Sequence, residues 1–145
     1  MRAEIVGVGT ELLLGQIANT NARWMSERLA GIGVDVLHHQ VVGDNLDRIV
    51  AVLELAAGRA DVVLVTGGLG PTQDDITRDA LAVAMGAQMR RDPRIEAFLY
   101  ERFAGFGRGE MPKNNLRQAD VPEGARTIMP QQGSAPGLIA DIRGV

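Results

Sequence analysis

Strand-like apolar segments alternate with helix-like amphipathic segments in the first part of the chain, and this alternation limits the folds that it can adopt. The second helix-like segment is the clearest, because its apolar residues recur at the i, i+3, i+4, i+7 spacing before Gly58: Leu46, Ile49, Val50 and Leu53. Each expected helix follows an expected strand, and these strands are Ala3–Val8, Asp35–Val42 and Asp61–Thr66. The alternation predicts an α/β fold with a mainly parallel sheet, helices on both faces, and ligands beyond the carboxyl ends of the strands.

The third of these strands is a continuous apolar run, which is expected for a strand buried on both faces of a sheet. The chain after it is less regular. We expect a helix containing Ile95, Phe98, Leu99 and Phe103, a flexible connection at 102–112, a short helix at Lys113–Ala119, and strands at 125–129 and 137–142. Residues 1–145 are expected to form one domain. Because the chain stops within or just after the last strand, we expect part of that domain to be missing at the C-terminus.

Composition excludes several classes of protein. The longest apolar runs fall short of the roughly 20 residues that a membrane span needs, and no secretion signal precedes the first strand, so a cytoplasmic protein without membrane contact is expected. The net charge is −3 and no basic stripe with interleaved aromatic residues occurs, which argues against nucleic-acid partners. The absence of cysteine excludes thiolate metal sites and cysteine nucleophiles.

The stretch VVLVTGGLGPTQDDIT (62–77) combines glycines with acids. Gly67, Gly68 and Gly70 allow the backbone to approach a ligand and to present N–H groups, which predicts a phosphate-binding loop. In an alternative interpretation the stretch is a tight turn with Asp75 as a helix cap, but this leaves Thr72 and Asp74 unexplained. The motif G-x-x-x-x-G-K-[ST] is absent and the single lysine, Lys113, lies elsewhere, so the loop is not that of a P-loop NTPase.

Two adjacent carboxylates beside a phosphate repel it unless a cation lies between them. A divalent ion such as Mg²⁺ resolves this conflict, because it is typically bound by one or two carboxylates together with substrate phosphates and waters. We therefore expect Asp74 and Asp75 to bind a divalent metal ion.

Further polar residues follow the first two strands. Thr10, Glu11, Asn19 and Asn21 belong to the loop after the first strand and are expected to face the glycine-containing loop. Asp44, after the second strand, is equally consistent with a residue of the ligand edge and with a turn or cap. His38 and His39 point to opposite faces of their strand, so they are interpreted as exposed strand residues and not as a metal site.

Four motifs together resemble the N-terminal domain of the CinA family of competence/damage-inducible proteins: GTELLLGQIANTN (9–21), VGDN (42–45), TGGLGPTQDDIT (66–77) and NNLRQADVPEGA…GSAPG (114–137). That domain is part of the molybdopterin-binding superfamily that includes MogA and MoaB. The resemblance implies a three-layer α/β/α sandwich that self-associates as a dimer or trimer. It also implies a metal-dependent ADP-ribose pyrophosphatase, or, as in the molybdopterin branch, binding of a pterin phosphate and adenylyl transfer.

The resemblance also suggests roles for single residues. Asp75 matches the carboxylate of the superfamily motif, Asp44 matches a second acid, and Ser134 stands where the family commonly has threonine. Asn115 and Gln118 match an NxxQA motif. The remaining matches are the residues of the glycine motif that would contact substrate or its phosphates: Thr66, Gly67, Gly68, Leu69, Gly70, Thr72 and Thr77.

The leading functional hypothesis is a hydrolase in which Asp74 or Asp75 binds the metal ion or orients the attacking water, with Glu11 as a third acid. The alternatives are a molybdopterin-binding or adenylyl-transferring domain and a non-catalytic nucleotide-binding module. All three hypotheses require a small phosphorylated ligand, either a nucleotide or a pterin phosphate.

Overall fold

A computed structural model describes residues 1–105 and 110–145 of the chain. The elements follow one another as β1 (Arg2–Val8), α1 (Thr10–Leu13), α2 (Thr20–Gly31), β2 (Asp35–Val42), α3 (Leu46–Ala57), β3 (Val62–Thr66), α4 (Thr77–Met85), β4 (Met89–Arg91), α5 (Pro93–Gly105), the 3₁₀ helix η1 (Lys113–Ala119), β5 (Asp120–Pro122), β6 (Arg126–Ile128) and β7 (Gly137–Ile139). The expected α/β alternation is confirmed over the first half of the chain.

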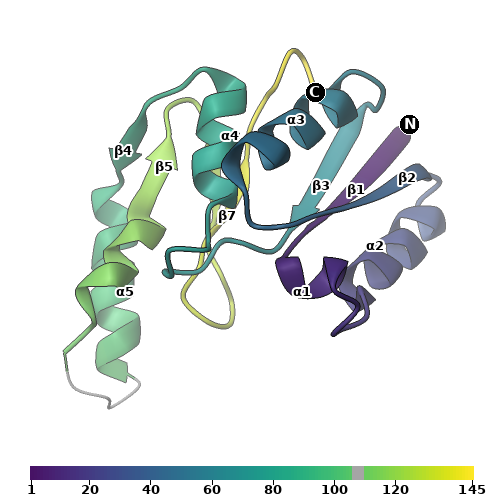
Figure 1. The fold of residues 1–145 in the computed structure, drawn as a ribbon. Coiled ribbons are helices and arrows are strands. Elements are labelled where there is room, and N and C mark those ends of the chain that lie inside the picture. The colour runs from purple at the N-terminus through teal and green to yellow at the C-terminus, as the bar shows by residue number, and fades with distance from the viewer. Residues whose placement is uncertain (106–109) are drawn as a thin grey trace.

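The three long strands form a parallel sheet in the order β2-β1-β3. Helix α3 covers one face, with α4 packed beside it, while α2 contacts β1 and β2 on the other face, which gives three layers (Figure 1). The main core lies under α3 and α4, where Val6 and Val8 of β1 pack against Ile49 and Leu53 of α3. The 3.6-residue periodicity of α3 therefore places its apolar side chains against the sheet and forms the helical layer on this face.

The expectation for β3 is wrong in one respect. All five of its residues are only half-buried, because β3 pairs with β1 alone. Its apolar sequence is thus not a sign of burial on both faces. Leu46, at the start of α3, is also exposed, unlike the other apolar residues expected on that face.

A second group of elements, which we call the satellite unit (Met89–Pro122), packs beside α4 (Figure 1). It contains the antiparallel pair β4–β5, helix α5 and η1, and it has its own core of Ile95, Leu99, Ala119 and Val121. The short helix expected at Lys113–Ala119 is present as η1. The flexible connection expected at 102–112 begins within α5, and residues 106–109 of it lie outside the described residues.

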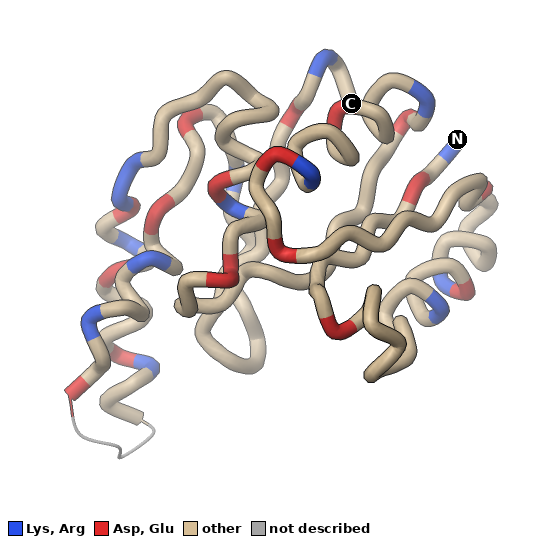
Figure 2. The backbone as a smooth tube through the Cα atoms, viewed as in Figure 1, with Lys and Arg blue, Asp and Glu red and all other residues tan. Residues whose placement is uncertain are grey.

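The strands expected at 125–129 and 137–142 are present as the shorter antiparallel pair β6–β7. Figure 2 shows acidic and basic residues interspersed along the backbone. Among the residues that the structure describes, no helix has the length and apolar character needed to cross a bilayer.

Candidate functional site

The segment between β3 and α4, residues 67–76, is called the glycine loop here. Gly67 and Gly68 have φ angles of 100° and 66°, a region that side-chain-bearing residues rarely adopt. A Cβ on Gly67 would collide with the Val8 carbonyl, and one on Gly68 would collide with the Thr77 hydroxyl. Thr77 stabilises this conformation by donating its hydroxyl to the Gly67 carbonyl at 2.8 Å. Glycine is therefore required at both positions.

Asp75 forms a tight turn within the glycine loop by bonding to Thr72, three residues earlier. Its Oδ2 accepts hydrogen bonds from the Thr72 N–H at 2.9 Å and from the Thr72 hydroxyl at 2.6 Å. The residue that caps α4 is Ile76, without a side-chain hydrogen bond, so the interpretation of Asp75 as a helix cap is wrong. Asp75 bonds backward along the chain instead, and so defines the shape of the loop.

Asp75 remains ionised at neutral pH. Its partial burial alone would raise the pKa of the carboxyl group. The hydrogen bonds from Thr72 and from the Gly70 N–H, together with the charge of Arg78, outweigh that effect and lower the pKa below its ordinary value. The donors of Gly70 and Thr72 are thus taken by Asp75, whereas the N–H groups of Gly68 and Leu69 donate to no other described residue. Both groups are therefore available to a ligand.

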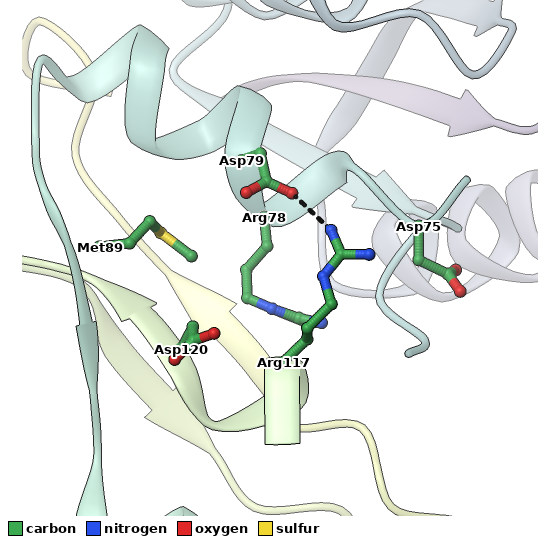
Figure 3. A pocket seen from close by; sticks show the side chains of 6 residues that line it. All are labelled: Asp75, Arg78, Asp79, Met89, Arg117 and Asp120. Atoms are coloured by element: carbon green, nitrogen blue, oxygen red, sulfur yellow. Dashed lines mark hydrogen bonds and ion pairs between the residues drawn. The ribbon is translucent and has the colours of Figure 1, made fainter. Parts of the chain in front are cut away.

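Two arginines bind the carbonyl side of the glycine loop. Arg78, which is 3% exposed, donates to the Leu69 carbonyl at 2.7 and 3.1 Å and to the Gly70 carbonyl at 3.3 Å. Arg117, from η1 of the satellite unit, donates to the Thr72 carbonyl at 2.6 Å and to Asp79 at 3.2 Å. In Figure 3 both side chains lie beneath the first turn of α4, with the Asp75 side chain farther along the loop.

Sequence reasoning missed both arginines, although one of them carried a signal. Arg78 is a cation in the first turn of a helix, where the macrodipole disfavours positive charge, so a specific partner was to be expected. Burial lowers the pKa of its guanidinium, which nevertheless stays charged. Arg117 lies inside the NxxQA motif, where nothing in the local sequence marks it.

A cavity of about 80 Å³ separates α4 from the satellite unit. Its lining alternates cations and acids, so neither sign dominates (Figure 3): Asp75, Arg78, Asp79, Met89, Arg117 and Asp120. This balance favours internal ion pairing over capture of a free anion or cation.

The loops that follow β1 and β3 face each other, as expected. Asn21, in the first turn of α2, donates its side-chain amide to the hydroxyl of Thr66, the last residue of β3, at 3.1 Å. Beside this contact lies a cavity of about 120 Å³ whose lining includes Glu11, Asn19 and Gly67. Asn19 also caps α2 by accepting from the Ala22 N–H at 3.1 Å. The cavity therefore opens directly beside the first glycine of the glycine loop.

Asp44 has a different role from a cap. The cap of α3 is Asn45, which accepts from the Arg48 N–H at 3.1 Å. Asp44 accepts from the backbone N–H and the hydroxyl of Thr10, at 3.0 and 2.8 Å. Asp44 thus ties the loop after β2 to the loop after β1, and its contact with a ligand stays a prediction.

Three residues suggested by the resemblance lie away from these contacts. Asn115 and Gln118 are buried in η1, where the Gln118 amide donates to Asn115 at 3.0 Å and Asn115 donates to the Pro112 carbonyl. These contacts give both side chains a structural role in η1. Ser134 lies between β6 and β7 and has no hydrogen-bond partner among the described residues.

The acids near the glycine loop suit a sparsely coordinated ion. Asp74 is exposed and has no partner among the described residues, and Asp75 is ionised. In the described part of the chain, no group of three or more acidic or histidine side chains could hold a metal ion. One or two carboxylates with substrate phosphates are the donors that Mg²⁺ typically uses, so Asp74 and Asp75 fit such an ion only together with a ligand.

Comparisons with known proteins place the chain in a family. A family profile described as "Probable molybdopterin binding domain" matches residues 4–139. The CinA-like protein of Frankia casuarinae is 49% identical over 146 residues, which cover 98% of this chain and 34% of that protein. The chain thus spans about a third of the length of the curated relatives that it matches.

Solved structures agree with this placement. The crystal structure of CinA from Thermoplasma acidophilum matches with a TM-score of 0.90 at 34% identity, covering 99% of this chain and 83% of that one. The molybdopterin biosynthesis enzyme MoaB from Thermus thermophilus matches with a TM-score of 0.56 at 24% identity, covering 83% and 78%, and shows a shared fold. The chain therefore belongs to the CinA-like branch of the molybdopterin-binding domain family.

Proposed function

We propose that this domain is a metal-dependent pyrophosphatase that acts on ADP-ribose. Two observations carry the proposal together. Gly67 lines the 120 Å³ cavity, and the N–H groups of the next two residues, Gly68 and Leu69, have no acceptor among the described residues. A diphosphate bound by these N–H groups would have its sugar beside Glu11 and Asn21. The CinA resemblance of the motifs supports the choice of ADP-ribose among such ligands.

In the proposed hydrolysis, the N–H groups of the glycine loop, the two aspartates and Glu11 have different roles. Preorganised N–H groups stabilise negative charge that develops on the diphosphate oxygens. Asp74 and Asp75 would hold a divalent ion, and such an ion neutralises the diphosphate and makes a bound water more acidic. Glu11, on the cavity wall, is placed to accept a hydrogen bond from a sugar hydroxyl or from the attacking water. Water then adds to one phosphorus and the P–O–P bond breaks, which yields AMP and ribose 5-phosphate.

A second candidate function is binding of a pterin phosphate. The match to a family described by molybdopterin binding favours it, and so does the fold shared with MoaB. The same glycine loop would bind the single phosphate, with the pterin in the cavity. This ligand does not require Asp74 to bind a metal ion.

The pyrophosphatase can be distinguished from a pterin-phosphate-binding domain by incubating the protein with ADP-ribose, or with ATP, in the presence of Mg²⁺ and by analysing the products. We expect AMP and ribose 5-phosphate from ADP-ribose, and no products when EDTA is added. Gly68→Val is the matched negative variant, because its side chain would collide with Thr77. If the wild type forms no product with any divalent ion but binds a pterin phosphate, the hydrolase proposal is wrong and the second candidate stands.

A further inference from the structure

Thr72 is held from both sides of its backbone. On one side its N–H and hydroxyl donate to the Asp75 carboxylate, at 2.9 and 2.6 Å. On the other side its carbonyl accepts from the Arg117 guanidinium at 2.6 Å. Both contacts are charge-assisted, which makes them shorter and stronger than hydrogen bonds between neutral groups. Thr72 therefore connects an anion of the glycine loop to a cation of the satellite unit.

Arg117 reaches the glycine loop from outside the parallel sheet and its helices. It belongs to η1, 45 residues from Thr72 in the sequence. Its second contact, with Asp79 of α4, places the guanidinium beside the first turn of that helix (Figure 3). Its side chain is 38% exposed, so its replacement leaves no buried hole in the core.

We infer that Arg117 is a positioning residue for the glycine loop, acting through Thr72 on the Asp75 carboxylate. This inference deepens the proposed function and rests on it. Without Arg117 the Thr72 carbonyl keeps only the bond of 3.3 Å from the Asp75 N–H, so the turn of Thr72 and Asp75 loses its anchor to the satellite unit. Because two of the hydrogen bonds that orient Asp75 come from Thr72, the carboxylate moves with it. The satellite unit thereby becomes part of the site, although Arg117 itself does not need to touch substrate.

Amide hydrogen exchange tests the link without reference to any substrate. In Arg117→Ala we expect faster exchange at the Thr72 and Asp75 N–H groups of the glycine loop, which donate to the Asp75 carboxylate and to the Thr72 carbonyl, and unchanged exchange in β1 and α3. Asp79→Asn is the matched control, because it removes the charge pair with Arg117 while the bond from Arg117 to Thr72 stays. We expect loop exchange in this control to equal that of the wild type. Unchanged loop exchange in Arg117→Ala, or equal acceleration in both variants, would overturn the inference.

Turnover of ADP-ribose tests the consequence for chemistry. Loss of a residue that orients a metal-binding carboxylate typically costs 10- to 100-fold in metal affinity or activity. We expect Arg117→Ala to lower kcat by about that factor and to raise the Mg²⁺ concentration for half-maximal activity, with KM for ADP-ribose little changed. Arg117→Lys should restore much of the loss, because one ammonium donor suffices for the Thr72 carbonyl.

The two experiments fail in distinguishable ways. If the wild type does not hydrolyse ADP-ribose, the proposed function is wrong, while exchange still decides whether Arg117 positions the loop. If the wild type is active and exchange rises in Arg117→Ala without any change in kcat or Mg²⁺ dependence, the positioning role is overturned. A thermal midpoint close to that of the wild type shows that the variant is folded in either case.

Discussion

Glu4 and Asp75 are both carboxylates held near arginines, but they are held in different ways. Glu4, in β1, is 0% exposed and receives two direct bonds of 2.8 Å from the Arg59 guanidinium, one on each carboxylate oxygen. Asp75 meets no arginine directly. It is bonded to Thr72, and Arg117 bonds to the far side of the same residue.

The difference shows that Glu4 stabilises the fold, whereas Asp75 is positioned as part of the candidate site. Glu4 is fully buried, and its carboxylate accepts from Arg59 on both oxygens and from the Gln40 amide on one, so it is inaccessible to a ligand and serves the sheet. The link through Thr72 sets the position of Asp75 while its charge is not neutralised by a direct arginine contact. The following predictions test this contrast, in order of the expected loss of unfolding free energy.

The largest effect is expected for Glu4→Ala. Removal of one partner of a buried ion pair typically costs 3 to 5 kcal/mol. Arg59 is 34% exposed and can turn toward water, so we expect the low end of that range, about 3 kcal/mol, from denaturant unfolding. Exchange in the glycine loop should stay that of the wild type in the folded fraction. Loss of stability below about 1 kcal/mol would show that Glu4 does not fix the sheet.

Gly68→Ala should have the next largest effect, and Gly86→Ala is its matched control. Both glycines have φ near 65°, so alanine at either position costs about 1 to 2 kcal/mol. At Gly86 nothing lies within 4 Å of a new Cβ, whereas at Gly68 the Thr77 hydroxyl does. We expect both variants to melt earlier, but only Gly68→Ala to lose ADP-ribose binding by calorimetry. Equal binding in the two variants would remove Gly68 from the site.

Asp75→Asn should lower stability by less than about 1 kcal/mol, because an amide oxygen still accepts from Thr72. Its negative charge is lost, so we expect most ADP-ribose turnover to disappear and to recover in part at high Mg²⁺. Asp74→Asn is the companion variant, and at least one of the two should behave in this way. Full turnover in both would exclude these acids and leave Glu11 and Asp44 as candidates.

The smallest effect concerns pH. The hydrogen bonds from Arg59 are the largest reason why the pKa of Glu4 lies below its ordinary value of 4.5. A carboxyl group with a lowered pKa in the folded state stabilises the protein above its unfolded pKa, and the contribution is lost as pH falls through the folded pKa. We therefore expect wild-type stability to decrease below about pH 4.5, and to decrease less steeply in Glu4→Gln. Parallel pH curves would contradict the lowered pKa.

The parallel half of the molecule could be predicted from sequence because its signals are local. The strand Asp35–Val42 matches β2, and the apolar spacing of α3 places Ile49 and Leu53 in the core. The glycine motif similarly marks Gly67 and Gly68, since their backbone angles require glycine. Periodicity and turn chemistry act over a few residues, and this is the range that a single sequence reveals.

The satellite unit and its contact with the site could not be predicted in the same way. Strands β4 and β5 have three residues each, and Arg91 pairs with Asp120 across α5 and η1. Segments of three residues are too short to show the alternation of apolar and polar residues that marks a strand. Their pairing depends instead on the packing of α5. The position of Arg78 in the first turn of a helix indicates that it has a partner, but the carbonyl acceptors of Arg78 and Arg117 are backbone groups, which any sequence supplies. The sequence therefore does not show that these two arginines bind the glycine loop.

The hydrogen bond from Arg117 to Thr72 also has a consequence for the order in which the site is made during synthesis. The two residues are 45 positions apart, and Thr72 comes first. At about 5 to 20 residues per second, the ribosome adds Arg117 on the order of 2 to 9 s after Thr72. When the glycine loop and Arg78 have been made, the loop therefore still lacks Arg117, and the main core still lacks Ile142. The contact between the glycine loop and the satellite unit can therefore form only after Arg117 has been made.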